Sequence, residues 1–301
     1  MAHDHAHSHA VINYDRAFAV GVALNLGYIV IEAAVGIAIH SLALLADAGH
    51  NASDVLCLLL AWGASYLTKT APTKRHTYGL RSSSILASLV NAIILLVAMG
   101  AIGWEAVRRF AQPISVPGNP VMLVAAIGVL INGATALLFM KGRAHDLNIK
   151  GAFLHMAADA GVSAGVIIAG LAINLTGAQW IDPIVSLLIV IVVAIGTWGL
   201  LRDSINLSLA AVPSDIDPVA VEQYLSALPG VTKVHDLHIW AMSTTQVALT
   251  VHLVMSPAKV DDSFLARTAH ELEHEFGIEH ATIQIEAGNG PQCHLAPEER
   301  V

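Results

Sequence analysis

Charged residues are scarce in this sequence. Of its 301 residues, 13% are Asp, Glu, Lys or Arg, 55% are hydrophobic, and the mean hydropathy is +0.64. Soluble globular domains carry about 25% charged residues. The composition therefore excludes an ordinary soluble protein.

Cysteine is nearly absent as well. The two cysteines, Cys57 and Cys293, stand far apart, one in an apolar run and one in the C-terminal tail, so no disulfide framework is predicted. The sequence also lacks a nucleotide-binding loop with the Gly-x4-Gly-Lys-Ser/Thr pattern. We therefore do not expect ATP to drive its activity.

The net charge of −8 is distributed unevenly along the chain. Residues 1–211 hold ten acidic and eleven basic side chains, whereas residues 212–301 hold thirteen acidic and four basic ones. A C-terminal part this acidic disfavours nucleic acid as a partner and attracts cations instead.

Six apolar segments follow the N-terminal tail, and each is near or above the ~20 residues that a helix needs to cross a bilayer. They lie at about residues 16–38, 41–66, 83–108, 120–140, 149–176 and 181–203. The sequence thus predicts an α-helical membrane protein with six transmembrane helices.

Lysine and arginine mark the cytoplasmic side of these spans. They cluster around the second connection (Lys69, Lys74, Arg75, Arg81) and the fourth (Lys141, Arg143, Lys150). On the other side we find only Arg108 and Arg109. Both termini are therefore expected in the cytoplasm.

The region after Pro213 reads as a small soluble domain. Residues 217–228 and 261–276 have helical patterns, and residues 231–240, 246–255 and 281–286 have strand patterns. The order αββαβ predicts a two-layer α+β domain of ferredoxin-like or metallochaperone-like type, with a free sheet face that could serve self-association.

Two near copies of one motif carry the chemistry. His50 and Asp54 lie in the second apolar segment, and His155 and Asp159 lie in the fifth, each pair at i and i+4 on one helix face. Ionisable groups inside a membrane are costly and usually functional. Two imidazoles and two carboxylates form a four-coordinate set suited to a divalent ion such as Zn²⁺.

Two further acids lie near the first motif copy. Asp47, three residues before His50, is predicted either to fix the tautomer of that imidazole or to line the ion path. Glu32, in the first segment, either lines the ion path or lies near the outer end of its helix in water.

The chain resembles the cation diffusion facilitators, in their zinc-transporting branch. The resemblance rests on residues 41–55 (SLALLADAGHNASDV), 151–163 (GAFLHMAADAGVS), 235–240 (HDLHIW) and 280–286 (HATIQIE), and covers nearly the whole chain. The closing GPQCHL, residues 290–295, resembles the tail of bacterial zinc, cadmium and cobalt exporters.

This resemblance implies a homodimer in a bacterial inner membrane that exports Zn²⁺, or also Cd²⁺ or Co²⁺, in exchange for protons. It places the transported ion at His50, Asp54, His155 and Asp159. It also implies a charge pair between the third and sixth spans, which here would have to join Arg81 to Asp203.

The family also binds zinc in its cytoplasmic domain, as a structural or regulatory ion. The candidate ligands here are His235, His238, His252, His280, Glu286, Cys293 and His294. Because strand residues alternate between two faces, not all of them can share one site. His270 and His274, spaced i and i+4 on a predicted helix, fit either a metal-binding pair or a solvated helix face.

The expected division of the chain has four parts. These are a His-rich cytoplasmic tail (1–15), the transport domain (16–211), a metal-binding and dimerisation domain (212–290) and a C-terminal tail (291–301). The histidines of the first part, His3, His5, His7 and His9, fit either weak metal capture or a solvated tail.

Two alternatives to an antiporter remain open on sequence alone. A membrane metallo-hydrolase would use a His-Glu-x-x-His pattern, which occurs once, from His270 to His274. A membrane-anchored metal sensor would use the spans only as an anchor. The intramembrane pairs lack the general base that a hydrolase needs, so we favour transport.

Overall fold

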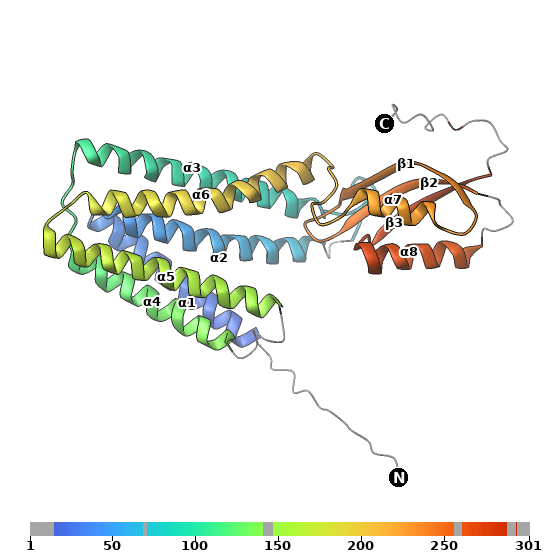
Figure 1. Cartoon of the computed structure of the whole chain (residues 1–301). Coiled ribbons are helices and arrows are strands. Elements are labelled where there is room, and N and C mark those ends of the chain that lie inside the picture. The colour runs from blue at the N-terminus through green and yellow to red at the C-terminus, as the bar shows by residue number, and fades with distance from the viewer. Residues whose placement is uncertain (1–14, 69–70, 141–146, 256–260, 288–292, 294–301) are drawn as a thin grey trace, which may run out of the picture. The chain divides into compact units, whose positions relative to one another are not determined.

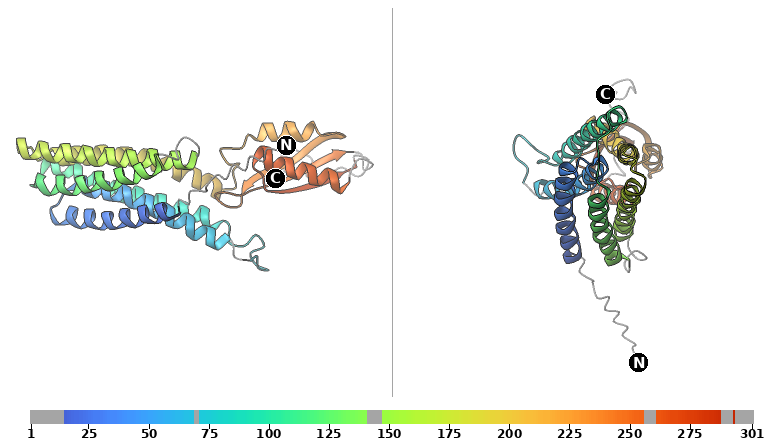
Figure 2. Two further views of the ribbon diagram at one scale, coloured as in Figure 1. Left: turned by 90° about the horizontal axis from the view of Figure 1, so that it is seen from below. Right: turned by 90° about the vertical axis from the view of Figure 1, so that its left-hand side faces the viewer.

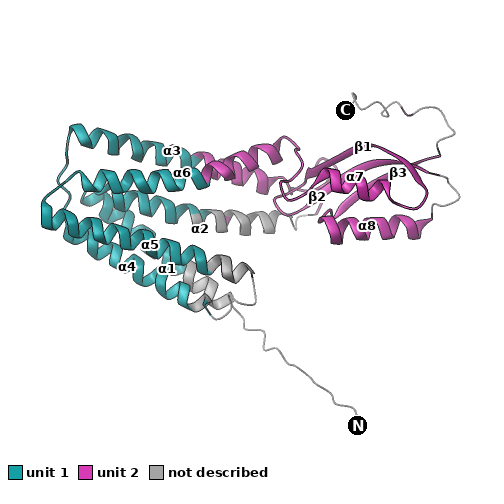
Figure 3. Ribbon diagram, viewed as in Figure 1, with its two compact units in different colours: residues 1–56, 94–196 teal, residues 57–93, 197–301 magenta. Residues whose placement is uncertain are grey.

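A computed structural model describes residues 15–68, 71–140, 147–255, 261–287 and 293 (Figure 1). Within its helices, the side chains of residues 15–22, 54, 57–58, 60–68, 138–139 and 147–152 lie outside the description. The chain divides into two compact units, residues 1–56 with 94–196 and residues 57–93 with 197–301 (Figure 3). Each unit is described by itself.

Six long helices come first in the chain, close to the predicted segments. They are α1 (Asp15–Ala38), α2 (Leu42–Thr68), α3 (Ser83–Ala111), α4 (Gly118–Phe139), α5 (Leu147–Thr176) and α6 (Ile181–Ser208). Over the described residues, α3, α4, α5 and α6 are long and apolar enough to cross a membrane, whereas the apolar stretch of α1, Ala23–Ala38, is shorter. The helical membrane domain is thus confirmed.

The first unit buries one core and leaves other apolar side chains outside. Tyr28, Leu44, Met99, Val121 and Val166 pack together in its interior. Large side chains such as those of Leu130, Leu175 and Ile195 remain more than two-thirds exposed, at 71%, 77% and 71%. A surface this apolar is stable only against lipid.

Helices α4 and α5 lie side by side because small residues form their contact (Figure 2). A Cβ atom on Gly118 would collide with the carbonyl oxygen of Gly170 and with the side chain of Asn174. Glycine at this position lets the two backbones approach closely, as membrane helices commonly do. This packing joins the start of α4 to the second half of α5.

The second unit contains the predicted small α+β domain. Its elements are α7 (Pro218–Ser226), β1 (Val231–Ala241), β2 (Val247–Met255), α8 (Asp262–Phe276) and β3 (His280–Glu286). The sheet order is β1-β2-β3, with β1 antiparallel and β3 parallel to β2. This αββαβ order agrees with the sequence pattern.

Local signals fix the ends of both helices. Asp217 accepts a hydrogen bond from the Val219 amide at the start of α7, and Asp261 accepts one from the Phe264 amide at the start of α8. Gly277 ends α8 in the left-handed region, with φ of 69°. Leu225, Leu249 and Leu272 then join the core between the helices and the sheet.

Candidate metal sites

The paired motif brings two histidines to one buried carboxylate. His50 Nε2, on α2, lies 3.3 Å from Asp159 Oδ1, and His155 Nε2, one turn before Asp159 on α5, lies 3.6 Å from Oδ2. The two ring centroids are 6.3 Å apart. The structure thus groups three of the four predicted transport ligands, whereas the side chain of Asp54 lies outside the described residues.

Asp159 has the environment of a cation ligand. Its side chain is 2% exposed, and its Oδ1 atom accepts no hydrogen bond from the described residues, although a ring nitrogen lies 3.3 Å away. That contact is therefore electrostatic rather than a directed hydrogen bond. A buried carboxylate oxygen in this state is costly, and a divalent ion between the rings would satisfy it.

Asp47 and Glu32 form a buried polar network beside this site. Asp47 Oδ2 accepts a hydrogen bond from Ser163 Oγ at 3.1 Å. Glu32 accepts one from the Tyr28 hydroxyl at 2.7 Å and a longer one from the Asn51 amide at 3.5 Å. Sequence reasoning missed Tyr28, Asn51 and Ser163, because isolated hydroxyl and amide side chains in apolar helices give little signal.

The charge pair between α3 and α6 lies at the other end of these helices from the predicted one. Among the described residues no ion pair joins Arg81 to Asp203. Instead, the Arg109 guanidinium lies 3.4 Å from Asp182 Oδ2 and also donates to the carbonyl oxygen of His40. The Arg81–Asp203 pair stays a prediction, and the buried pair at the other ends of the helices was not predicted from the sequence.

Asp182 also caps the start of α2. Its carboxylate accepts hydrogen bonds from Ser41 Oγ at 2.7 Å and from the amides of Leu42 and Ala43 at 2.9 and 3.2 Å. A helix N-terminus favours an anion. One buried carboxylate therefore joins the ends of α2, α3 and α6.

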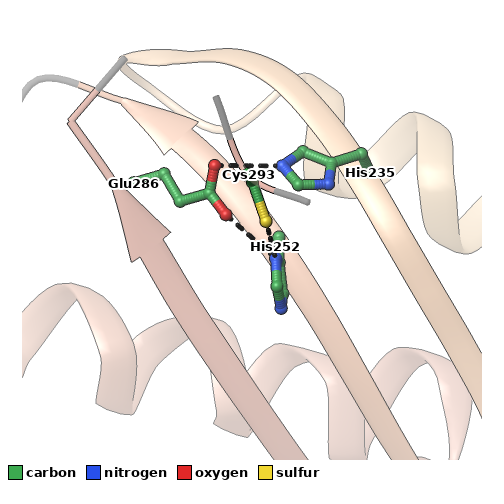
Figure 4. A group of neighbouring side chains, drawn as sticks. All are labelled: His235, His252, Glu286 and Cys293. Carbon is green, nitrogen blue, oxygen red and sulfur yellow. Dashed lines mark hydrogen bonds and ion pairs between the residues drawn. The ribbon is translucent and has the colours of Figure 1, made fainter. Parts of the chain in front are cut away.

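A second cluster of possible ligands spans the three strands of the sheet in the second unit (Figure 4). His235 on β1 faces His252 on β2, and Glu286 ends β3. Glu286 lies 3.2 Å from His235 Nε2 and 2.9 Å from His252 Nδ1, and Cys293 Sγ lies 3.7 Å from the latter nitrogen. Ligand atoms of all four residues lie within 4.8 Å of one another, which fits a zinc ion.

Asp236 supports this cluster from behind. A register shift in β1 between His235 and His238 accompanies φ of 52° at Asp236, a left-handed backbone that is unusual for a side-chain-bearing residue. Its carboxylate lies 3.4 Å from His252 Nε2 and 3.0 Å from His238 Nε2. It therefore holds the ring of His252 with Nδ1 directed into the cluster, as carboxylates behind metal-binding histidines do.

The charge of Glu286 is maintained by its neighbours. Burial alone would raise its pKa, but hydrogen bonds from Cys293, His235 and His252 and the charge of His235 lower the pKa below its usual value. The carboxylate therefore stays ionised at neutral pH and remains available to a cation.

The other predicted cytoplasmic ligands do not join the cluster. His280 begins β3, six residues before Glu286, so about 20 Å of strand separates them, and its ring packs on Tyr78. His294 lies outside the described residues. His270 and His274 stack on the exposed face of α8 with ring centroids 4.2 Å apart.

Two family models match the chain over both of its parts. The model described as the cation efflux transmembrane domain matches residues 18–207, and the one described as the cation efflux protein cytoplasmic domain matches residues 213–288. Together they define a multi-pass membrane protein with a cytoplasmic C-terminal domain. The chain belongs to the cation efflux family, the cation diffusion facilitators, as the sequence motifs indicated.

Relatives are similar over nearly their full length. The chain is 37% identical to the zinc transporter ZitB of Escherichia coli, covering 98% of this chain and 96% of that protein. It is 35% identical to the metal cation efflux system protein CzcD of Cupriavidus metallidurans, covering 98% and 94%. It is 33% identical to the cadmium, cobalt and zinc/H(+)-K(+) antiporter of Bacillus subtilis, covering 93% and 91%.

Solved structures also match, and one of them covers the cytoplasmic domain. The metal-bound C-terminal domain of the CzcD transporter from Cupriavidus metallidurans is 41% identical, covering 24% of this chain and 99% of that chain, with a TM-score of 0.22. The family assignment shows that the chain is a metal cation efflux transporter and not an enzyme. The metallo-hydrolase alternative is thereby excluded.

Proposed function

We propose that the chain is a proton-coupled antiporter that exports Zn²⁺ from the cytoplasm, with the ion held by His50, Asp54, His155 and Asp159. The observation that carries the proposal is the buried Asp159 carboxylate, with one ring nitrogen from each of two helices within 3.6 Å. Relatives named as zinc transporters, or as a cadmium, cobalt and zinc antiporter, support the substrate class.

The charges of this site suit release as well as capture. Two carboxylates neutralise a divalent ion, so that the loaded site carries no net charge in the membrane. Imidazole binds a metal only in its neutral form, and its pKa is ordinarily about 6.5. Protons supplied from outside would therefore compete with the ion for His50 and His155.

We further propose the expected architecture around this site. All six long helices span the membrane, with both termini in the cytoplasm and the domain limits given by the sequence pattern. The membrane is the inner membrane of a bacterium, by analogy with bacterial relatives. The family model that covers residues 213–288 carries the name ZT_dimer, which supports a homodimer.

In the cytoplasmic domain, His235, His252, Glu286 and Cys293 would hold a resident Zn²⁺. Such an ion would tie β1, β2 and β3 to Cys293, and so stabilise the sheet. Because the ligands come from separate parts of the chain, zinc binding and domain order are expected to be linked.

Flux through proteoliposomes tests the transport assignment. Under an imposed pH gradient the wild type should move Zn²⁺, and Asp159→Ala should abolish this flux, while Asp215→Ala, at an exposed position of the second unit, should leave it unchanged. Zinc flux through Asp159→Ala at the wild-type rate would exclude this carboxylate from the ion path. Repeating the wild-type assay with Cd²⁺ and Co²⁺ establishes the metal range.

A further inference from the structure

Two carboxyl groups lie buried together in the membrane unit, outside the four transport ligands. Glu32 on α1 and Asp47 on α2 are each 0% exposed. The Tyr28 hydroxyl, which donates to Glu32, and Ser163 Oγ, which donates to Asp47, both lie against the position that a Cβ atom on Gly128 would take, so the two carboxyl groups share one enclosure. Two adjacent carboxylates in such a place cannot both be ionised without a cation between them.

The neighbours of this pair are rich in oxygen atoms. Tyr28 donates to Glu32, Ser163 donates to Asp47, and a Cβ atom on Gly128 would collide with the Tyr28 hydroxyl. Glycine at position 128 therefore leaves the space in which the Tyr28 hydroxyl lies. Helices α1, α2, α4 and α5 all contribute to the enclosure.

One unsatisfied atom shows where a proton belongs. Asp47 Oδ1 is buried and accepts no hydrogen bond from an N–H or O–H donor of the described residues. A proton on the Glu32 carboxyl would turn that group into the missing kind of donor. The other titratable groups near Asp47 are His50 on the same helix and Asp159 on α5.

The pair lies one helical turn from the transport site. Asp47 precedes His50 by three residues on α2, and its partner Ser163 follows Asp159 by four residues on α5, so the two layers are about 5 Å apart. The carboxyl pair lies nearer the start of α2 than the His50–Asp159 layer does, and Asp182 joins the start of α2 to the start of α6. The end of α6 leads into the cytoplasmic domain, so the pair lies on the side of that layer away from the cytoplasm.

We propose that the Glu32–Asp47 pair is a proton site of the transport cycle, and that Glu32 carries the proton. When a divalent ion binds at the His50–Asp159 layer, its positive charge favours two ionised carboxylates, and the Glu32 proton leaves to the cytoplasmic solvent. When a proton returns from the outer side, the pair loses one negative charge and the ion is held less tightly. One proton per cycle thus moves without occupying a metal ligand.

This proposal rests on the proposed antiport, and a proton count tests it. The full-length chain carrying His235→Ala and His252→Ala is titrated with Zn²⁺ in a weak buffer containing a pH dye, so that the sheet cluster does not contribute to the tight binding. Glu32→Gln, a neutral side chain of the same shape, should release about one proton fewer per ion bound, and its zinc affinity should depend less on pH. Glu279→Gln, at an exposed position, is the control and should release the same number of protons per ion as the background protein.

Tyr28→Phe should strengthen proton binding at Glu32, whereas Glu32→Gln removes the proton site. Loss of the hydroxyl removes a donor to the ionised Glu32, so the proton is held more tightly and zinc binding at pH 7 should weaken about tenfold. An equal proton count in Glu32→Gln and its background would overturn the proposal. The proposal would also be overturned if adding K⁺ at constant ionic strength changed the number of protons released, because the pair would then hold a monovalent metal ion.

The failure of the proposed function gives a different result. If Asp159→Asn leaves zinc binding unchanged in the same background, the transport site is misassigned, whatever the proton count. Glu32→Gln protein that binds Zn²⁺ with the stoichiometry of its background is correctly folded, so a changed proton count cannot be attributed to misfolding.

Discussion

The buried Arg109–Asp182 pair allows a stability prediction with a worked magnitude. The side chains are 7% and 1% exposed, and the carboxylate also accepts three hydrogen bonds at the start of α2. Removing the buried partner of a charged group costs about 3–5 kcal/mol. In Asp182→Ala the guanidinium keeps Glu105 Oε1 at 3.5 Å and the carbonyl oxygen of His40, so we expect the low end of that range, about 3 kcal/mol. Loss of the helix cap adds about 1 kcal/mol, which gives a total of about 4 kcal/mol.

Arg109→Met should cost less, because Asp182 keeps its three donors from α2. The double variant should be less destabilised than the sum of the two single variants, by up to about 3 kcal/mol. Reversible unfolding of the purified full-length protein in mixed micelles measures these energies. Arg108→Met is the matched control. The Arg108 side chain, next to Arg109 in the sequence, is 57% exposed, so its loss should change stability by less than about 0.5 kcal/mol.

The reasoning fails if Asp182→Ala is no more destabilised than the Arg108 control. It also fails if the effects of the two single variants simply add, because the two groups would then not interact. Either result would mean that the ends of α2, α3 and α6 are held together by something other than this carboxylate.

Three further predictions concern the sheet cluster and the helix packing. Asp236→Asn should weaken zinc binding at the cytoplasmic site about 10–100-fold, measured by calorimetry on the full-length chain. His252→Ala should weaken it more, since a ligand itself is lost. Equal zinc affinities of Asp236→Asn and the wild type would contradict the supporting role of Asp236. Zinc affinity at this site should fall as the pH is lowered, because protons compete with the metal for its ligands; an affinity that stays constant down to about pH 4 would contradict the ligand set. Since Glu286 has a lowered pKa in the folded chain, its contribution to stability is present above its ordinary pKa of about 4.3 and is lost only as pH falls through the lower folded value. Gly118→Ala should lower the melting temperature of the detergent-solubilised protein, because the added Cβ forces α4 and α5 apart; an unchanged melting temperature would show that the contact can relax.

The sequence predicted those features that repeat along one element. Apolar length located the helices, alternation located the strands, and the i, i+4 spacing put His155 beside Asp159 on one face of α5. These signals are local. They follow from helix and strand geometry, whatever the packing between elements.

Features that depend on packing between elements were not predicted. The ion pair of α3 and α6 was assigned to Arg81 and Asp203, although the acidic residue in the first turn of α6 was a signal that could have pointed to Asp182. Strand length separates His280 from Glu286, but the sequence before Cys293 has no periodicity from which its position beside His252 could be predicted. Side-chain partners of this kind require coordinates.

Zinc binding to the membrane site, counted per chain, tests the central claim most directly. The full-length protein with His235→Ala and His252→Ala should bind one Zn²⁺ per chain tightly at pH 7, and Asp159→Asn should remove that site while its folded fraction stays unchanged. Undiminished binding of one zinc ion by Asp159→Asn would contradict the account, because the cation would then have to be held elsewhere in the membrane.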